Sequence, residues 1–102
     1  MLELRPTCEH CNRALPPESA EARICSFECT FCLACVDAVL LGTCPNCGGG
    51  FVPRPVRPAE DRKGGNFLGN YPAATTVRHR PVDPAAHAAF VAALRERLAA
   101  GR

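Results

Sequence analysis

The sequence is poor in the bulky apolar side chains that fill a large core. Its 102 residues include no Trp, one Tyr, one Met and five Phe. Because so little bulky material cannot fill the interior of an enzyme of this length, Rossmann, TIM-barrel and hydrolase folds are excluded. No apolar run approaches the roughly 20 residues that cross a membrane, and residues 1–5 show no signal-peptide pattern. We therefore expect one small domain in the cytoplasm.

Catalytic signals are scarce as well. The three histidines, His10, His79 and His87, stand far apart in the sequence. Residues 48–50 are three Gly, but the Lys-Ser/Thr pair of a phosphate-binding loop does not follow them. No nucleophile stands beside a general base. The sequence therefore predicts a protein that is not an enzyme and has no small-molecule substrate.

Cysteine, by contrast, is abundant, with eight residues in the chain. In a reducing compartment such cysteines are more often metal ligands than disulfide partners. Zinc takes four ligands in a tetrahedron, so eight thiolates make two closed sites with no open position to activate water. We predict two structural Zn2+ ions as cofactors, with an iron–sulfur cluster or a dithiol redox centre as alternatives. The candidate ligands are Cys8, Cys11, Cys25, Cys29, Cys32, Cys35, Cys44 and Cys47.

Charge divides the chain after Pro53. Residues 1–53 have three Arg and six acidic residues, a net charge of −3, whereas residues 54–102 have nine Lys or Arg and four acidic residues, a net charge of +5. A basic segment beside an acidic domain is typical of nucleic-acid binding, of an acidic partner, of self-association through docking of the basic tail, or of a solvated linker. Nucleic-acid binding through residues 54–80 is therefore an alternative function. Its candidate phosphate contacts are Arg54, Arg57, Arg62, Lys63, Arg78 and Arg80.

Three parts are expected along the chain. Residues 1–53 form the two-zinc domain, residues 54–82 form a linker that contains Pro and Gly, and residues 83–101 form a C-terminal helix. Closely spaced prolines at the start of the linker favour an extended backbone and exclude a helix there.

The C-terminal element is expected to be an amphipathic α-helix over about residues 84–100. Asp83 is a good N-cap, Pro84 suits the first helical position, and Gly101 follows as a terminator. His87 lies beside the apolar stripe and is expected to be a surface or packing residue. Because the zinc domain uses its own few apolar residues, we expect the stripe to contact a protein partner or a second copy rather than that domain. The stripe is Ala86, Phe90, Val91, Leu94 and Leu98.

The order of the cysteines resembles a RING finger over residues 8–47. Phe31 stands directly before the fifth cysteine, and residues 36–41 can form a short helix after the sixth. The last pair belongs to the sequence Cys-Pro-Asn-Cys, a common ending of RING fingers. The sequence departs from that pattern at Cys29, which replaces a histidine as the fourth ligand.

This resemblance implies a cross-brace fold with a short hairpin and a short central helix. One zinc ion is then held by Cys8, Cys11, Cys32 and Cys35, and the other by Cys25, Cys29, Cys44 and Cys47. The spacing also allows sequential pairing, in which the first four cysteines share one ion and the last four share the other. We expect a small core between the sites from Phe27, Phe31, Leu33, Val36, Val39 and Leu40, with Leu15 and Ile24 at its edge. Phe31 is expected to be buried, and Phe27 is the better candidate for a partner contact.

RING ubiquitin ligases usually dock a conjugating enzyme through an aliphatic residue before the second ligand and a large apolar residue in the central helix. They often have a basic residue after the last ligand. In this chain the residue before the second ligand is His10, and the residue after the last ligand is Gly48. The chain has no Trp, and only Pro45 matches the ligase pattern. Ligase-like activity is therefore a remote alternative.

Four further segments carry a second resemblance: LELRPTCEHC, LPPES, ARICSFECTFC and CPNCGG. They are similar to the small bacterial family known as domain of unknown function 1272, across roughly residues 1–58. That resemblance implies a bacterial origin and supplies no mechanism. We therefore expect a non-catalytic protein-interaction module, built on structural zinc, that acts in an unknown pathway without a membrane.

Overall fold

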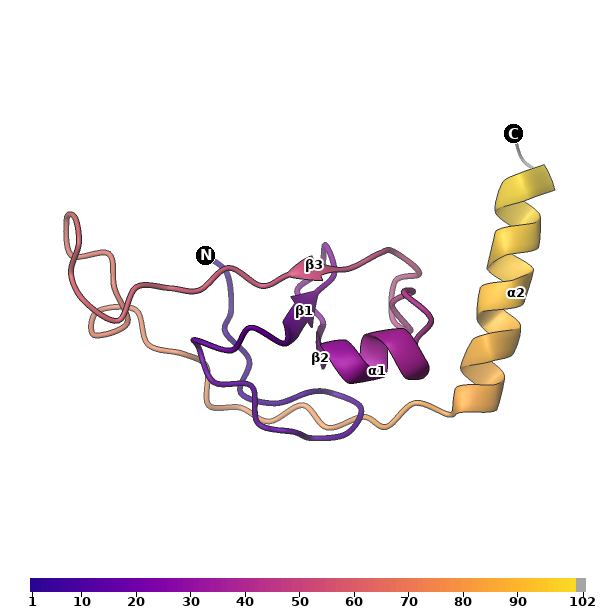
Figure 1. Ribbon diagram of the computed structural model, residues 1–102, viewed down its shortest axis with the longest axis horizontal. Helices are drawn as coiled ribbons and strands as arrows, with labels where there is room; N and C mark the ends of the chain where they lie inside the picture. The colour runs from indigo at the N-terminus through magenta and orange to yellow at the C-terminus, as the bar shows by residue number, and fades with distance from the viewer. Residues whose placement is uncertain (101–102) are drawn as a thin grey trace.

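The computed structural model describes residues 1–100. Its elements follow in the order β1 (Ala22–Ile24), β2 (Thr30–Cys32), α1 (Leu33–Ala38), β3 (Val52–Pro53) and α2 (Pro84–Ala100). Figure 1 shows the strands and α1 together in the middle of the molecule, with α2 at one end and a long loop at the other. The regular part of the fold is therefore small, in keeping with the shortage of bulky apolar residues.

The three strands form an antiparallel sheet in the order β2-β1-β3. Ile24 of β1 lies opposite Thr30 of β2 on one side and opposite Val52 of β3 on the other. Residues 25–29 form the turn of the hairpin between β1 and β2, and Glu28 takes a left-handed φ of 64° there. The short hairpin predicted from the RING resemblance is thus present, and its turn contains two of the cysteines.

Helix α1 begins directly after β2, earlier than the predicted residues 36–41. Cys32 is still extended, and the backbone becomes helical from Leu33 onward. Leu41 and Gly42 take left-handed φ values of 55° and 74°, which end the helical path. The amide of Gly42 donates to the carbonyl of Val36 at 3.0 Å and closes the C-terminal end. The short central helix is confirmed, but its predicted boundaries are wrong.

The core lies between the sheet, α1 and the cysteines. Phe31 is 1% exposed, and its ring meets that of Phe51 edge-on with centroids 5.6 Å apart. The prediction for Leu33 is wrong, because the first turn of α1 leaves this side chain exposed. Phe27 is 70% exposed at the tip of the hairpin turn, and Leu4 is a core residue that the pattern did not reveal. Buried as predicted are Phe31, Val36, Leu40, Leu15 and Ile24, while Val39 is partly buried.

Arg54 attaches the chain after β3 to the N-terminal region. This residue is 4% exposed, and its guanidinium donates to the carbonyls of Arg5, Leu15 and Pro16 at 2.9, 3.1 and 3.0 Å. It was predicted only as a candidate phosphate contact. That prediction is wrong, because the guanidinium is buried within the chain and is inaccessible to a phosphate.

Residues 54–82 form no helix or strand, as expected for the linker, but they contact the domain. Figure 1 shows the chain looping away beyond β3 and running back beside the N-terminal part. On the return path, the amide of Ala74 donates to the carbonyl of Leu4 at 3.0 Å, and that of Arg80 donates to the carbonyl of Glu9 at 2.7 Å. This segment is therefore docked on the domain rather than free in solvent, since backbone hydrogen bonds hold its second half against the N-terminal segment.

Helix α2 begins as predicted. The carboxylate of Asp83 accepts hydrogen bonds from the amides of Ala85 and Ala86 at 3.0 and 3.3 Å, which is the geometry of an N-cap. Pro84 occupies the first helical position. Gly101, the predicted terminator, lies outside the described residues.

The first half of α2 packs on the cysteine-rich part of the same chain. From the sequence, this helix was expected to contact another molecule instead. His87 and Val91 are buried, and Nε2 of His87 lies 2.8 Å from the carbonyl oxygen of Leu40. Arg95 donates to the carbonyl of Leu41 at 3.3 Å. The expectation overlooked these carbonyls, which the end of α1 leaves available to hydrogen-bond donors from α2.

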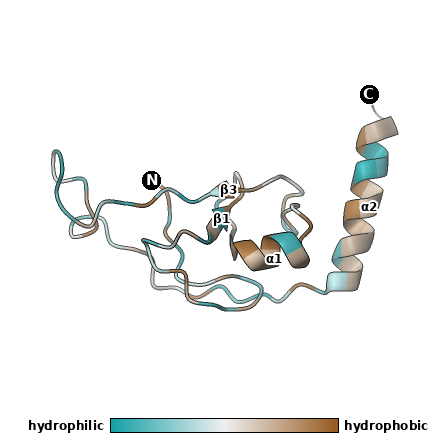
Figure 2. Ribbon diagram, in the orientation of Figure 1, coloured by the Kyte–Doolittle hydropathy of each residue, from teal (hydrophilic) through white to brown (hydrophobic). Residues whose placement is uncertain are grey.

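The apolar stripe of α2 is therefore only partly covered. Phe90 is 41% exposed and Leu98 is 55% exposed. Figure 2 shows hydrophobic and hydrophilic residues following one another along this helix. Within residues 1–100, neither helix combines the length and apolar content that a membrane crossing requires.

Candidate metal centres

The first group of thiols lies between the N-terminal loop and the junction of β2 with α1. The four sulfur atoms all lie within 4.8 Å of one another, and those of Cys11 and Cys32 are 3.8 Å apart. Three of these residues are buried, and Cys11 is exposed. The group consists of Cys8, Cys11, Cys32 and Cys35.

Backbone hydrogen bonds shape the loop that presents the first pair of this group. The amide of Cys8 donates to the carbonyl of Arg13 at 2.9 Å, and the amide of Asn12 donates to the carbonyl of Cys8 at 2.9 Å. Asn12 takes a left-handed φ of 63°, which Asn tolerates better than most residues. The tight turn brings the two sulfurs of the pair to one side.

The second group lies between the hairpin turn and the loop before β3. The sulfur atoms of Cys25, Cys44 and Cys47 lie within 4.8 Å of one another. Cys29, the fourth predicted ligand, is buried, but its sulfur does not lie within this distance of all the others. The structure thus brings together the whole first set and three of the four residues of the second.

Backbone amides point at the sulfurs of the second group. The amide of Phe27 donates to Cys25 Sγ at 3.3 Å, that of Asn46 to Cys44 Sγ at 3.4 Å, and that of Gly49 to Cys47 Sγ at 3.4 Å. Such donors stabilise the negative charge of a thiolate. The turns around these cysteines are therefore suited to metal-bound thiolates.

The two groups interleave along the sequence, which is the cross-brace arrangement and excludes the sequential pairing. The hairpin explains this order. The amide of Glu9 donates to the carbonyl of Thr30 at 3.0 Å, which lays the first loop beside β2. Cys8 and Cys32 therefore meet, although Cys25 and Cys29 lie between them in the sequence.

Burial makes these groups costly to charge without a cation. It raises the pKa of the Cys35 thiol above its ordinary value, and the neighbouring thiol of Cys32 and the charge of Cys8 raise it further. Burial also raises the pKa of Cys44, although the amide of Asn46 acts in the opposite direction. A positive ion among the sulfurs offsets both effects, because it favours the thiolate forms.

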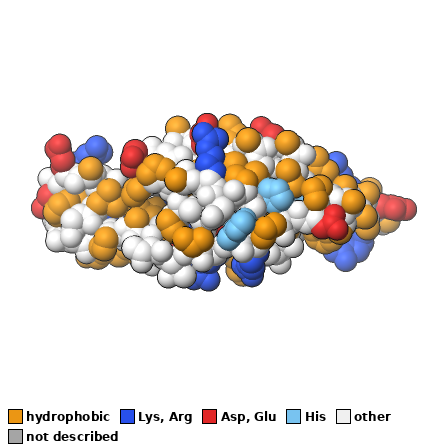
Figure 3. Space-filling view, turned by 90° about the horizontal axis from the view of Figure 1, so that it is seen from below, with side chains coloured by type: hydrophobic (Ala, Val, Ile, Leu, Met, Phe, Trp, Pro, Cys, Tyr) orange, Lys and Arg blue, Asp and Glu red, His pale blue; other side chains and the backbone are white. Residues whose placement is uncertain are grey.

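The donor set fits a closed metal site. Four sulfurs surround one position in the first group, and no histidine or carboxylate belongs to either group among the described residues. The histidines have other partners: Nδ1 of His10 accepts from the amide of Val82 at 2.9 Å, and Nε2 of His79 lies 3.0 Å from the carbonyl oxygen of His10. Figure 3 shows histidines close together on one face, away from any cluster of acidic residues.

Glu9 is a supporting residue that the sequence reasoning missed. Its side chain is 1% exposed, and Oε2 accepts from the amide of Thr30 at 2.7 Å and from Arg5 at 3.0 Å. Oε1 lies 3.3 Å from Arg80. Glu9 thus joins the loop of the first group to β2 and to the returning segment. The sequence offered one sign of this role, which is an arginine, Arg5, four residues before Glu9. An arginine and a glutamate at this spacing are too common to identify a buried carboxylate.

Comparison with known proteins gives one family and one relative. The family model described as a protein of unknown function (DUF1272) matches residues 1–57. An uncharacterized protein of Rhizobium meliloti (strain 1021) is 59% identical over 81 residues, which are 79% of this chain and 89% of that protein. No solved structure matches the chain. The matched residues 1–57 include both thiol groups and Arg54.

Proposed function

Because the chain belongs to the DUF1272 family, whose function is unknown, we propose its function from the site: it is a non-catalytic, zinc-stabilised module that binds other polypeptides. The supporting observation is the combination of two all-sulfur groups in a small fold with large apolar side chains left exposed. Closed sites hold a fold together and offer no position for a substrate. The exposed side chains offer contact area on a rigid support.

Zinc is the metal that suits these groups best. Tetrahedral sets of four thiolates are typical of zinc and iron–sulfur sites. At a zinc–sulfur distance of about 2.3 Å, the sulfurs of a tetrahedral site are about 3.8 Å apart. Cys11 Sγ and Cys32 Sγ are separated by 3.8 Å. We propose one zinc ion in each group, with Cys29 as the fourth ligand of the second, in a RING-like arrangement. Reduced, metal-bound thiols suit the cytoplasm.

The exposed face of α2 is the proposed contact for a protein partner, and a second copy of the chain is the simplest one. Phe90 and Leu98 are exposed on this helix. A hollow of about 130 Å³ lies between Phe90, Ala93, Leu94 and Arg97. A side chain from a facing helix fits such a hollow between the ridges of α2.

Sedimentation velocity over a concentration series tests this proposal. We expect the zinc-loaded chain to associate, and the double variant Phe90→Ser/Leu98→Ser to remain monomeric with unchanged zinc content. The control Ala89→Ser/Ala99→Ser makes changes of similar polarity beside the same positions and should still associate. A wild-type chain that stays monomeric at every concentration contradicts self-association through α2. Elemental analysis that finds one metal, or iron with visible absorbance, contradicts the two-zinc fold.

Nucleic-acid binding is a weaker alternative, because most of the proposed phosphate contacts are occupied. Arg57 donates to the carbonyls of Leu2 and Tyr71, while Arg78 and Arg80 lie 3.6 and 3.3 Å from acidic side chains. Figure 3 shows Lys and Arg scattered over the visible face rather than gathered in one patch. Steeply salt-dependent binding to a DNA oligonucleotide would favour this alternative.

Ubiquitin-ligase-like activity has less support still. Two positions that would face a conjugating enzyme, those of His10 and Pro45, lie against the chain's own C-terminal part. Val82 contacts His10, and a hollow lined by Pro45, Val82 and His87 lies at the base of α2. A conjugating enzyme would have to displace this segment before it reached them.

A further inference from the structure

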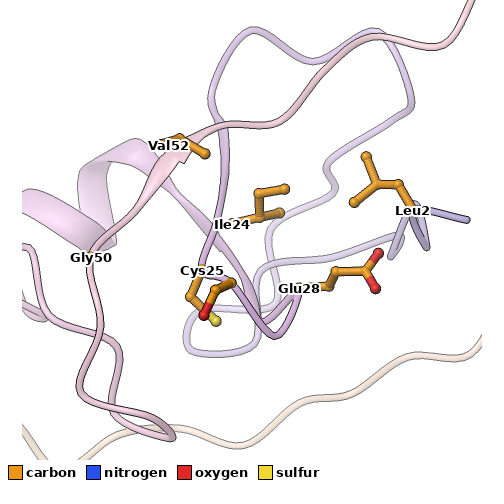
Figure 4. A pocket seen from close by; sticks show the side chains of 7 residues that line it. Leu2, Ile24, Cys25, Glu28, Gly50 and Val52 are labelled. Atoms are coloured by element: carbon orange, nitrogen blue, oxygen red, sulfur yellow. The ribbon is translucent and has the colours of Figure 1, made fainter.

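A second apolar surface lies at the edge of the sheet where β1 ends and β3 begins. It is a groove of about 590 Å³ between the hairpin turn, the N-terminal segment and the loop before β3. Figure 4 shows Leu2, Ile24 and Val52 around it, with Glu28 beside Leu2 and Gly50 on the other side. Residues from three separate segments line the groove, and none of them belongs to α2.

The side chains of the groove and its rim are poorly covered by the rest of the chain. Val52 is 59% exposed on the edge strand β3. Phe27, which follows two lining residues in the hairpin turn, is 70% exposed. Exposed aromatic and aliphatic side chains of this kind are enriched at the centres of protein interfaces.

Glu28 provides the polar feature of the groove. Its side chain is partly buried, and Oε1 accepts a hydrogen bond from the amide of Glu3. Among residues 1–100, Glu28 has no cationic side chain within 4.0 Å, whereas Glu3, Glu9 and Glu21 each have an arginine partner. A carboxylate at an apolar groove without such a partner attracts a cation from outside.

The hairpin turn presents this surface in one conformation. Phe27 is held by the hydrogen bond from its amide to Cys25 Sγ, and the amide of Glu28 donates to the carbonyl of Cys25 at 3.0 Å. Glu28 keeps a left-handed φ of 64° in this turn. Since Cys25 belongs to the second thiol group, a metal ion bound there would hold this turn in place before a partner arrives and would reduce the entropy lost on binding.

We propose that this groove binds a polypeptide segment in which an apolar side chain stands next to an Arg or Lys. The apolar side chain enters between Leu2, Ile24 and Val52 and packs on Phe27, and the cation pairs with Glu28. The net charge of −3 over residues 1–53 favours the same basic partner. This inference rests on the proposed function as an interaction module but uses a surface separate from α2.

The test uses the zinc-loaded full chain and a display library of random peptides. Enriched peptides are synthesised, and their affinities are measured by fluorescence anisotropy. We expect the enriched sequences to place an apolar residue within two positions of Arg or Lys. Val52→Asp and Phe27→Ser should each weaken binding by about tenfold or more, as truncation of an interface anchor does. Glu28→Gln keeps the acceptor for the Glu3 amide and should weaken binding by a few-fold while reducing its salt dependence.

The variant Phe90→Ser is the matched control, because it makes the same Phe-to-Ser change at an exposed ring on the other surface. It should leave peptide affinity unchanged. Enriched peptides without a basic residue, or affinities that Val52→Asp and Glu28→Gln do not change, overturn the proposal for the groove. If those results occur while Phe90→Ser/Leu98→Ser still abolishes association, the proposed function survives and only the groove is rejected. If the groove variants abolish self-association instead, the occupant is a second copy and the proposed peptide is wrong.

Discussion

Residues 1–53 and residues 54–100 are held in place by different kinds of contact. The first region has all three strands, α1 and both thiol groups. The second has α2 as its one helix within the described residues, and much of it is attached by side chains that donate to backbone carbonyls, as Arg54, His87 and Arg95 do. The second region therefore depends on the first, because its acceptors are carbonyls that the fold around the cysteines positions.

Metal removal should have the largest effect and should disrupt both regions. Each structural zinc site contributes on the order of 10 kcal/mol to folding, more than a core of this size can replace. After chelation we expect loss of amide dispersion in NMR spectra over residues 8–47 and release of α2. Cys8→Ser, at a buried ligand position, should have the same effect, whereas Ser26→Ala beside the second group should not. If residues 84–100 keep their amide protection without metal, the second region does not depend on the first.

Loss of the Arg54 contacts should come next. Arg54→Met removes three hydrogen bonds and leaves buried carbonyls without donors, so we expect a loss of about 2–3 kcal/mol in the free energy of unfolding by urea. Arg62→Met changes an exposed arginine of the same segment and should cost less than about 0.5 kcal/mol. Equal effects of the two substitutions would mean that Arg54 does not join the regions.

The contact between α2 and the loop before β3 can be tested with two glycines. Gly48 has a φ of +76°, and an added Cβ would lie 3.4 Å from Phe90 Cζ, whereas nothing lies within 4 Å of one added at Gly50. We expect Gly48→Ala to cost about 1–2 kcal/mol because of its left-handed backbone, and to speed amide exchange in α2. Gly50→Ala should change both quantities little. Faster exchange in α2 of Gly50→Ala would contradict this contact.

The smallest effect should come from Glu3, which links the N-terminus to both regions. Arg5 lowers the pKa of the Glu3 carboxyl below its ordinary value, and the charge of Arg78 acts in the same direction. Because the folded pKa is depressed, the stabilisation is present above the ordinary pKa and is lost as pH falls through the folded pKa. Solvent screening limits it to a few tenths of a kcal/mol.

Urea unfolding of wild-type and Glu3→Gln chains at saturating zinc measures this contribution. The difference between them should be present at pH 7 and should disappear in acid. Protonation of the thiolates destabilises both chains alike and cancels in the comparison. A difference that grows as pH falls contradicts the pairing of Glu3 with arginine.

Much of the first region was predictable because metal chemistry acts through short spacings. Pairs of cysteines separated by two residues, Asp83 before Pro84, and Phe31 before Cys32 each indicate a local structure that neighbouring residues enforce. The family resemblance over roughly residues 1–58 also agrees with the matched residues 1–57. Leu33 was misplaced because hydrophobicity alone does not tell which side of a short helix faces the core.

The course of residues 54–82 was beyond the reach of sequence reasoning. An arginine in a proline-containing segment is expected to be exposed to solvent. No neighbouring residue in the sequence indicates that Arg54 is buried. Its acceptors, the carbonyls of Arg5, Leu15 and Pro16, lie far away along the chain. Backbone carbonyls are present at every residue, so the sequence cannot indicate which ones a side chain will meet.

The sequence by itself determined the cysteine-rich character of the protein, the number of thiols, the N-cap of α2 and the absence of material for a large core. Those features depend on residue type and on spacings of a few positions. Only the tertiary structure decided that the thiol groups interleave, that α2 packs on its own chain through His87 and Val91, and that Leu2, Glu28 and Val52 line one apolar groove. These outcomes depend on which distant backbone groups meet, and that is settled only when the whole chain folds.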